Sequence, residues 1–290
     1  MRCACIDIGS NTTRLLVAES KDGRLQEVMA QRTFTRLGSG KRDIPAPKVA
    51  EVAEVVASQV RMARECGVGA IRIVATAAIR QAPNRDAFCE AVEEAAGVAV
   101  VVLSGEDEAR LAFAGATRTL QHAPLGEIGV VDVGGGSSEL VVGTMPSGVS
   151  WSASFHVGSA MLADGYLRSD PPGVEELERV RAHVAGVFEG LEVPQPEVAY
   201  AVGGSATSLR RVVGAELSHE TLAHGLRVLG ATRAEDVAQR YELHLERVRV
   251  LPAGMLLLDE AARLLGCPLR IASGGLREGV VLEELAAVGS

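Results

Sequence analysis

The sequence DVGGGSSELVV, at residues 132–142, carries the strongest structural signal in the chain. An apolar run at residues 128–131 precedes it, three glycines at 134–136 form its centre, and two serines and Glu139 lead into a second apolar run. This pattern predicts a β-hairpin with a glycine-rich turn. Because glycine lacks a side chain and adopts positive φ angles readily, several N–H groups of the turn can point at one anion. We therefore predict a phosphate-binding loop here.

The same pattern occurs near the N-terminus, where residues 7–17 read DIGSNTTRLLV. Both stretches contain an Asp after an apolar run, a turn of small residues, hydroxyl side chains, a charged residue and a second apolar run. In this alignment Asp7 corresponds to Asp132, and Arg14 corresponds to Glu139. Two such hairpins in register indicate an internal duplication, in which each half presents a phosphate hairpin to a shared cleft.

Asp-x-Gly hairpins at the start of two lobes resemble the superfamily of actin, sugar kinases and the Hsp70 ATPase. Within it, the chain is similar to the exopolyphosphatase and guanosine pentaphosphate phosphatase family over nearly its whole length. The stretches that carry this resemblance are IDIGSNTTRLLVAE (6–19), TAAIRQAPN (76–84), LSGEDEARLAFAGA (103–116), VVDVGGGSSELVVG (130–143), AVGGSATSL (201–209) and GGLREGVVLEE (274–284).

The resemblance implies an α/β fold of two ribonuclease-H-like, actin-like ATPase lobes, with mixed sheets flanked by helices and an active site in the interdomain cleft. The predicted N-terminal lobe is 1–124, completed by a C-terminal helix at 276–290, and the C-terminal lobe is 125–275. Longer relatives carry a further helical region, so the chain resembles the short, two-domain form. A homodimer is expected from family analogy alone.

Composition limits the classes of function. The 290 residues include 47% hydrophobic residues, but no apolar run is long enough to cross a bilayer and no signal pattern is present, so we expect a cytoplasmic protein without membrane association. A net charge of −8 and 3% aromatic residues argue against nucleic acid as a partner. No cysteine pair has C-x-x-C spacing, and we expect buried free thiols, with Cys3 and Cys5 on the same side of a strand.

The alternation of strands and helices supports an α/β fold. A strand at residues 70–75 ends just before Arg80, at the kind of strand end where open α/β sheets hold ligands. A strand at residues 198–202 runs into Gly203, Gly204 and Ser205, and the helix that begins there offers unsatisfied N–H groups and a positive dipole to an anion. Residues 234–245 are predicted to form one continuous helix.

Hydrolysis of a terminal phosphoanhydride requires neutralised phosphate charge, an in-line water and a group that orients or deprotonates this water. Asp132 and Glu139 flank the glycine turn and are predicted to hold Mg²⁺ or another hard divalent cation. The alternative is that Asp132 caps the turn and Glu139 is a solvated strand residue. The predicted phosphate-binding residues are Asp7, Ser10, Asn11, Thr12, Arg14, Gly134, Gly135, Gly136, Ser137, Gly203, Gly204 and Ser205.

Glu108 occupies the position of the family's catalytic glutamate, so the resemblance implies that it activates the water. From spacing alone, Glu106 or Asp107 could face inward instead, and a first-turn acid can simply stabilise the helix dipole. Arg80 is the second predicted catalytic residue, since a guanidinium can clamp phosphate oxygens and stabilise transition-state charge.

The sequence thus predicts a magnesium-dependent exopolyphosphatase that hydrolyses the terminal phosphate of inorganic polyphosphate. Hydrolysis of the 5′ phosphate of guanosine pentaphosphate is the close alternative. Two readings of other classes stay open: a sugar or acetate kinase of the same superfamily, and a sensor that binds polyphosphate or an alarmone with little turnover.

Overall fold

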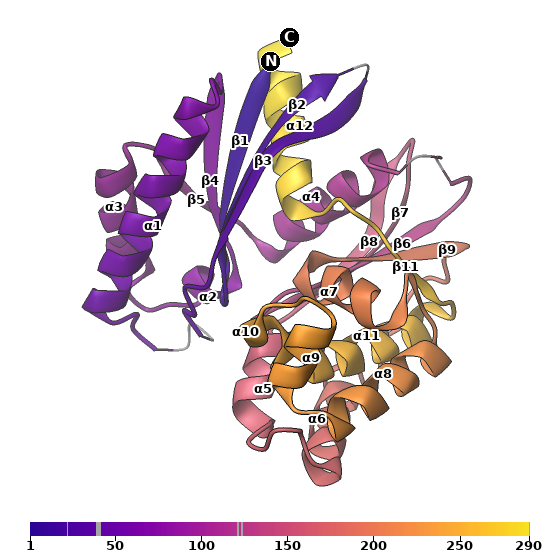
Figure 1. The fold of residues 1–290 in the computed structure, drawn as a ribbon. Helices are drawn as coiled ribbons and strands as arrows, with labels where there is room; N and C mark the ends of the chain where they lie inside the picture. Colours follow the sequence, from indigo (N-terminus) through magenta and orange to yellow (C-terminus); the bar gives the residue numbers. More distant parts are fainter. Residues whose placement is uncertain (22, 39–41, 121, 123, 290) are drawn as a thin grey trace. The chain divides into compact units, whose positions relative to one another are not determined.

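The computed structural model describes residues 1–21, 23–38, 42–120, 122 and 124–289 (Figure 1). The chain divides into two units, one formed by Met1–Thr119 with Gly274–Ser290 and the other by Leu120–Ser273. Each unit contains a mixed β-sheet flanked by helices, so the predicted fold class is confirmed.

The sheet of the first unit is built on a three-stranded antiparallel meander, to which two strands add in parallel. Its strand order is β3-β2-β1-β4-β5. The pairs β1–β2 and β2–β3 are antiparallel, whereas β1–β4 and β4–β5 are parallel. The strands are β1 (Arg2–Ile8), β2 (Thr13–Lys21), β3 (Arg24–Thr33), β4 (Ala70–Ala75) and β5 (Val100–Val102).

Helices cover both faces of this sheet (Figure 1), and alternation along β1 shows which side chains face which layer. Ala4, Ile6 and Ile8 pack in one core with residues of α1 (Ala46–Glu65) and α3 (Arg85–Ala96). Cys3 and Cys5 point the other way, into a core with residues of α4 (Gly105–Arg118) and α12 (Leu276–Gly289). The two thiols are free, buried and on the same side of the strand, as predicted, whereas Cys66, Cys89 and Cys267 are free but only half buried.

The backbones of α4 and α12 touch, because glycines line their contact. A Cβ on Gly115 would lie 1.9 Å from the carbonyl oxygen of Gly275, and a Cβ on Gly279 would lie 2.1 Å from that of Leu111. The C-terminal helix thereby fixes the position of α4 in the first unit.

The second unit repeats the meander and extends the parallel part of its sheet. Its strand order is β10-β11-β9-β6-β7-β8, with β6–β7 and β7–β8 antiparallel and β6–β9 parallel. The strands are β6 (Ile128–Val133), β7 (Ser138–Thr144), β8 (Gly148–Phe155), β9 (Val198–Val202), β10 (Glu216–Leu217) and β11 (Leu269–Ile271).

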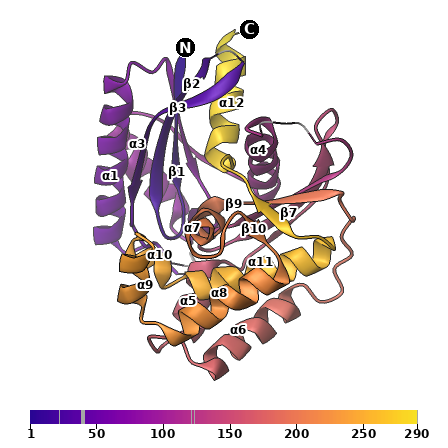
Figure 2. The same cartoon turned by 45° about the vertical axis from the view of Figure 1, so that its right-hand side comes forward.

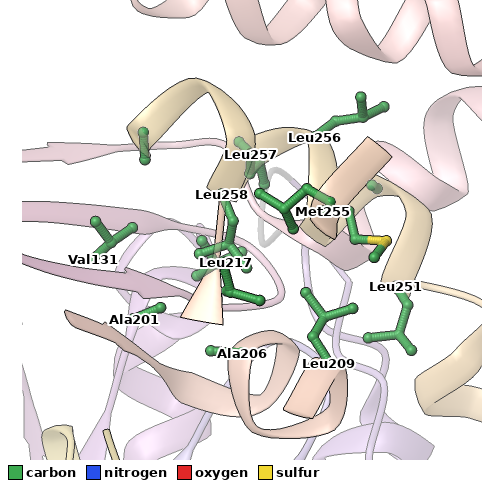
Figure 3. Close-up of a cluster of buried hydrophobic side chains, with 14 of the residues drawn as sticks. Val131, Ala201, Ala206, Leu209, Leu217, Leu251, Met255, Leu256, Leu257 and Leu258 are labelled. Carbon is green, nitrogen blue, oxygen red and sulfur yellow. The ribbon is translucent and has the colours of Figure 1, made fainter. Parts of the chain in front are cut away.

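The apolar helix α11 (Leu251–Leu265) is central to the core of this unit. Figure 3 shows Leu251 and Met255 of this helix near Leu209 of α7 (Gly203–Val213), with Val131 and Ala201 of the sheet in the same cluster. Figure 2 shows α6 and α8 running alongside α11. The remaining helices are α5 (Ser159–Tyr166), α6 (Val174–Val187), α8 (His219–Ala231), α9 (Ala234–Arg240) and α10 (Leu245–Val248).

The two hairpins match in backbone detail, which confirms the predicted duplication. Asp7 lies opposite Arg14 in the β1–β2 register, and Asp132 lies opposite Glu139 in the β6–β7 register. The turns close in the same way, with 3.0 Å bonds from Gly9 N to Thr12 O and from Gly134 N to Ser137 O. Both second strands also contain a register irregularity ten residues after the aspartate, following Val17 and Val142.

The prediction of one continuous helix at residues 234–245 is wrong. The helix α9 ends at Arg240, and Glu242 adopts a positive φ of 52°, which an α-helix of L-residues does not contain. The chain re-enters a short helix, α10, at Leu245. None of the described helices combines the length and apolar character needed to cross a membrane.

Candidate active site

The N-terminal hairpin turn is held by hydrogen bonds to its carbonyl oxygens. Besides the Gly9–Thr12 bond, the Arg36 N–H donates to Asn11 O at 3.1 Å, and the Gly38 N–H donates to Ser10 O at 3.2 Å. In a trans peptide the N–H points opposite to the C=O. The N–H groups of Asn11 and Thr12 therefore point away from residues 36–38, in a fixed direction suited to an anion.

Asp7 and Arg14 lie side by side next to this turn. Arg14 Nε donates to Thr12 Oγ1 at 3.1 Å, which ties the guanidinium to the loop. Burial raises the pKa of Asp7, and the nearby Arg14 and Arg277 partly offset this effect. Its Oδ1 atom is buried without a hydrogen-bond partner among the described residues.

Of the three acids at the start of α4, Glu108 is the buried one, with 5% exposure. Glu106 is exposed, and Asp107 is half-buried and engaged by Ser104, whose Oγ caps the helix by accepting from Asp107 N at 3.0 Å. Arg80 binds the Glu108 carboxylate through its guanidinium. Burial and this partner distinguish Glu108 from its neighbours, which sequence spacing alone did not.

Arg80 is itself fixed by the backbone. It ends α2 (Ala77–Arg80), a four-residue helix directly after β4, and its guanidinium also donates to Leu103 O at 2.7 Å. Since the same Nη1 atom contacts both Leu103 O and Glu108, the arginine fixes the carboxylate against the strand end.

In the second unit, the start of α5 clamps the glycine turn. Ser159 N donates to Gly134 O at 2.9 Å, and Ala160 N donates to Gly135 O at 3.0 Å. A Cβ on Gly158 would lie 2.4 Å from the carbonyl carbon of Gly135, so only glycine permits this approach. Sequence analysis missed this clamp; its only sequence signal is the small pair Gly158-Ser159 after β8.

Asp132 and Glu139 face each other across the β6–β7 pair. Glu139 is 3% exposed and accepts a 3.0 Å hydrogen bond from Ser154 Oγ of β8, a partner that sequence analysis also missed. A Cβ on Gly203 would come within 2.3 Å of Asp132 Oδ1, so the carboxylate occupies the space that a side chain would fill.

This pair of carboxylates suits a hard divalent cation that keeps waters and phosphate oxygens as its other ligands. Within the described part of the chain, no group of three or more His, Cys, Asp or Glu residues is arranged to hold a metal. Asp132 and Glu139 provide oxygen ligands of the kind that such a cation takes from protein carboxylates.

The first turn of α7 adds a second loop to the candidate residues of the second unit. Gly203 has a positive φ of 84° and begins the helix directly after β9. Ser205 is fully buried, and its Oγ lies so close to α11 that a Cβ on Gly254 would be 2.7 Å away. Its hydroxyl therefore faces the core, and only the backbone of the turn remains available to an anion.

The structure thus brings together two groups of predicted residues. Arg80 joins Glu108, and Asp7 joins Arg14 and residues 9–12, all in the first unit. The second group, in the other unit, contains Asp132, Glu139, the turn at residues 134–137 and the start of α7.

A duplicated meander with an Asp-tipped hairpin in each sheet defines the actin-like two-domain class of phosphate-binding proteins. Residues 16–288 match the model of the Ppx/GppA phosphatase family, and the chain belongs to this family.

Relatives and solved structures agree with this assignment. The chain is 30% identical to Exopolyphosphatase 2 of Mycobacterium tuberculosis over 90% of both chains. It is 29% identical to Exopolyphosphatase 1 of Mycobacterium leprae, over 98% of this chain and 90% of the relative. The crystal structure of the Aquifex aeolicus Ppx/GppA family member superposes with a TM-score of 0.83 at 27% identity, covering 100% of this chain and 99% of that one.

Proposed function

We propose that the protein is an exopolyphosphatase that releases the terminal phosphate of inorganic polyphosphate. The observation that carries this proposal is the buried Glu108, bound by Arg80. A protein that only binds phosphate has no need of a buried carboxylate with a fixed orientation. Relatives named exopolyphosphatase over nearly the whole chain favour polyphosphate as the substrate.

Asp132 and Glu139 are the residues that would hold Mg²⁺, which neutralises phosphate charge when bound. The hairpin turns at residues 9–12 and 134–137 and the start of α7 bind phosphate oxygens through N–H groups. Arg14 adds a guanidinium beside the first turn. These groups position the substrate and stabilise its charge, which is most of what phosphoryl transfer requires.

Glu108 accepts the proton of the attacking water. The water oxygen forms a bond to the terminal phosphorus as the bridging P–O bond breaks, and the shortened chain leaves with the bond electrons. Arg80 keeps the carboxylate oriented towards this water.

The decisive test compares Glu108→Gln with Glu106→Gln, an exposed acid in the same helical turn. Loss of the general base is expected to lower kcat by about 10²–10⁴-fold with little change in KM, whereas the Glu106 variant keeps wild-type turnover. Melting curves of both variants verify that the fold is intact. A Glu108→Gln enzyme with wild-type kcat would remove Glu108 from the mechanism.

Substrate choice is tested by phosphate release from long polyphosphate, short polyphosphate and guanosine pentaphosphate, each with and without Mg²⁺. We expect magnesium-dependent release, fastest from polyphosphate. Faster release from guanosine pentaphosphate would reverse the assignment, and tight binding without release would indicate a sensor. We also predict that the metal is Mg²⁺, that the protein is located in the cytoplasm and that it forms a homodimer.

A further inference from the structure

The duplicated sheets carry different charges at equivalent positions. In the second unit, one row across β6, β7 and β8 reads Asp132, Glu139 and Ser154. In the first unit, the equivalent row across β1, β2 and β3 reads Asp7, Arg14 and Arg32. Directly opposed residues in antiparallel strands share one face of a sheet. Carboxylates therefore dominate one row and guanidinium groups the other.

A third guanidinium joins the row of the first unit. Arg277 lies in the first turn of α12, the helix that packs against β1 and β2, and its side chain is 19% exposed. It lies close enough to Asp7 to lower that carboxyl's pKa. Arg32 is exposed, and partial desolvation of its guanidinium, followed by the charge of Arg277, lowers its pKa. The three arginines thus gather at one end of this face.

Two acids of the first unit lie near Arg32 and Arg277. Asp7 is one, and its raised pKa shows a poorly solvated carboxylate. Glu278 is the other; it lies 3.8 Å from Arg277 and accepts a 2.9 Å bond from Gly275 N at the start of α12. No carboxylate among the described residues forms an ion pair with Arg32.

Like charges directly opposite each other destabilise a sheet, and Arg14 faces Arg32 in the β2–β3 register. An anion bound between the two guanidinium groups would offset this repulsion. Guanidinium groups fit phosphate oxygens in two-pronged fashion, and neighbouring strands place successive groups about 4.8 Å apart. Because Arg14 is bonded to Thr12, the row continues directly from the phosphate turn.

We propose that Arg32 and Arg277, together with Arg14, form an anion subsite for phosphate groups of the chain beyond the one that is hydrolysed. The subsite rests on the proposed function, since it assumes a polyphosphate substrate. It makes Arg32 and Arg277 determinants of chain-length preference.

A competing explanation is that charged residues on the edge strand β3 merely prevent edge-to-edge pairing. The same hairpin offers a matched control, because Arg24 faces Lys21 at the opposite end of β3. Arg24→Gln removes the same charge from the same strand, about 27 Å from Arg32 at the usual rise per residue.

The experiment measures binding of long-chain polyphosphate, tripolyphosphate and guanosine pentaphosphate by calorimetry, in EDTA so that hydrolysis plays no part. Arg32→Gln and Arg277→Gln are expected to weaken binding of the long chain most. Each is expected to reduce the slope of log K against log salt by about 1, while Arg24→Gln binds as the wild type. In turnover assays with magnesium, Arg32→Gln and Arg277→Gln are expected to raise the KM for long polyphosphate by a larger factor than they lower kcat.

Arg32→Gln decides the matter if Arg277→Gln fails to fold, because Arg32 lies on an exposed edge strand. Binding by Arg32→Gln that equals binding by Arg24→Gln would overturn the subsite. A loss confined to guanosine pentaphosphate would overturn its assignment to polyphosphate. If the variants differ from the wild type in binding as expected, but the wild type releases no phosphate, the proposed hydrolase would be refuted. The subsite would still stand.

Discussion

Replacing Gly203 with alanine tests how the second unit holds Asp132. Gly203 has a φ of 84°, a conformation that alanine adopts only with strain. Its new Cβ would lie 2.3 Å from Asp132 Oδ1 and 3.2 Å from Val133 O. The change therefore combines backbone strain with displacement of a proposed metal ligand.

The two effects have different sizes. The strain costs about 1–2 kcal/mol, which lowers the melting temperature of a unit of this size by about 2–8 °C. The distance between the new Cβ and Asp132 Oδ1 must also grow from 2.3 Å to beyond 3.0 Å, below which real Cβ contacts essentially never fall. The carboxylate oxygen or the backbone must therefore shift by at least 0.7 Å. Misplacement of a reacting group by about 1 Å costs roughly 10²-fold in rate. We therefore expect a modest loss of stability and a large loss of activity.

Gly214→Ala is the matched control, since Gly214 also has a positive φ, 93°, at the other end of α7, with no atom near the position of a new Cβ. The assay is calorimetric melting together with magnesium-dependent phosphate release for both variants. Both variants are expected to lose stability through backbone strain, and only Gly203→Ala is expected to lose activity and magnesium affinity. Equal activities in the two variants would refute the role assigned to the contact with Asp132.

Two further predictions concern hydrogen bonds to carboxylates. Ser154→Ala removes the donor that orients Glu139 and is expected to weaken Mg²⁺ binding, measured by calorimetry, by about 10–100-fold. Ser152→Ala, on the same face of β8 but opposite Val141, is expected to leave the affinity unchanged, and equal affinities of the two variants would contradict this. The Ser169 hydroxyl is the main cause that lowers the pKa of Glu176 to about 2 in the folded protein. Its ionised form therefore stabilises the fold fully at pH values above the unfolded pKa near 4.5, and this stabilisation is lost as the pH falls through 2. Glu176→Gln is expected to cost about 2 kcal/mol in urea unfolding at pH 7, and the difference from wild type is expected to shrink between pH 5 and pH 2; a difference that does not depend on pH would exclude the charge as its source.

The hairpins were predictable because their signals are local. The Asp, the turn of small residues and the flanking apolar runs lie within eleven positions, and the register follows from the turn length. For the same reason the sequence predicts Asp132 and Glu139 at the two ends of the glycine turn, and the β6–β7 register pairs them directly. The roles of these residues stay predictions.

Burial and tertiary partners were not predictable. Spacing left Glu106, Asp107 and Glu108 equivalent; the packing of α4 makes Glu108 the buried one, and Arg80, 28 residues earlier, binds it. Ser154 pairs with Glu139 only because β8 returns beside β7.

The missed helices have equally physical causes. The eight-residue α5 is too short for a clear apolar period, although its start holds the glycine turn. Helix-forming side chains run through residues 234–245, and nothing local showed that Glu242 takes a left-handed conformation there. Tertiary contacts overrode helix propensity at that point.

The duplication also accounts for how an acidic protein can bind a polyanion. The net charge of −8 describes the whole chain and not the potential at one row of a sheet. The position seven residues after the hairpin aspartate has the same backbone register in both units, yet it carries Glu139 in one and Arg14 in the other. In the proposed mechanism, carboxylates hold a cation near the reacting group and guanidinium groups bind the rest of the chain. In this proposal one duplicated backbone supplies both, because each copy needs to differ only at the side chains of a single row.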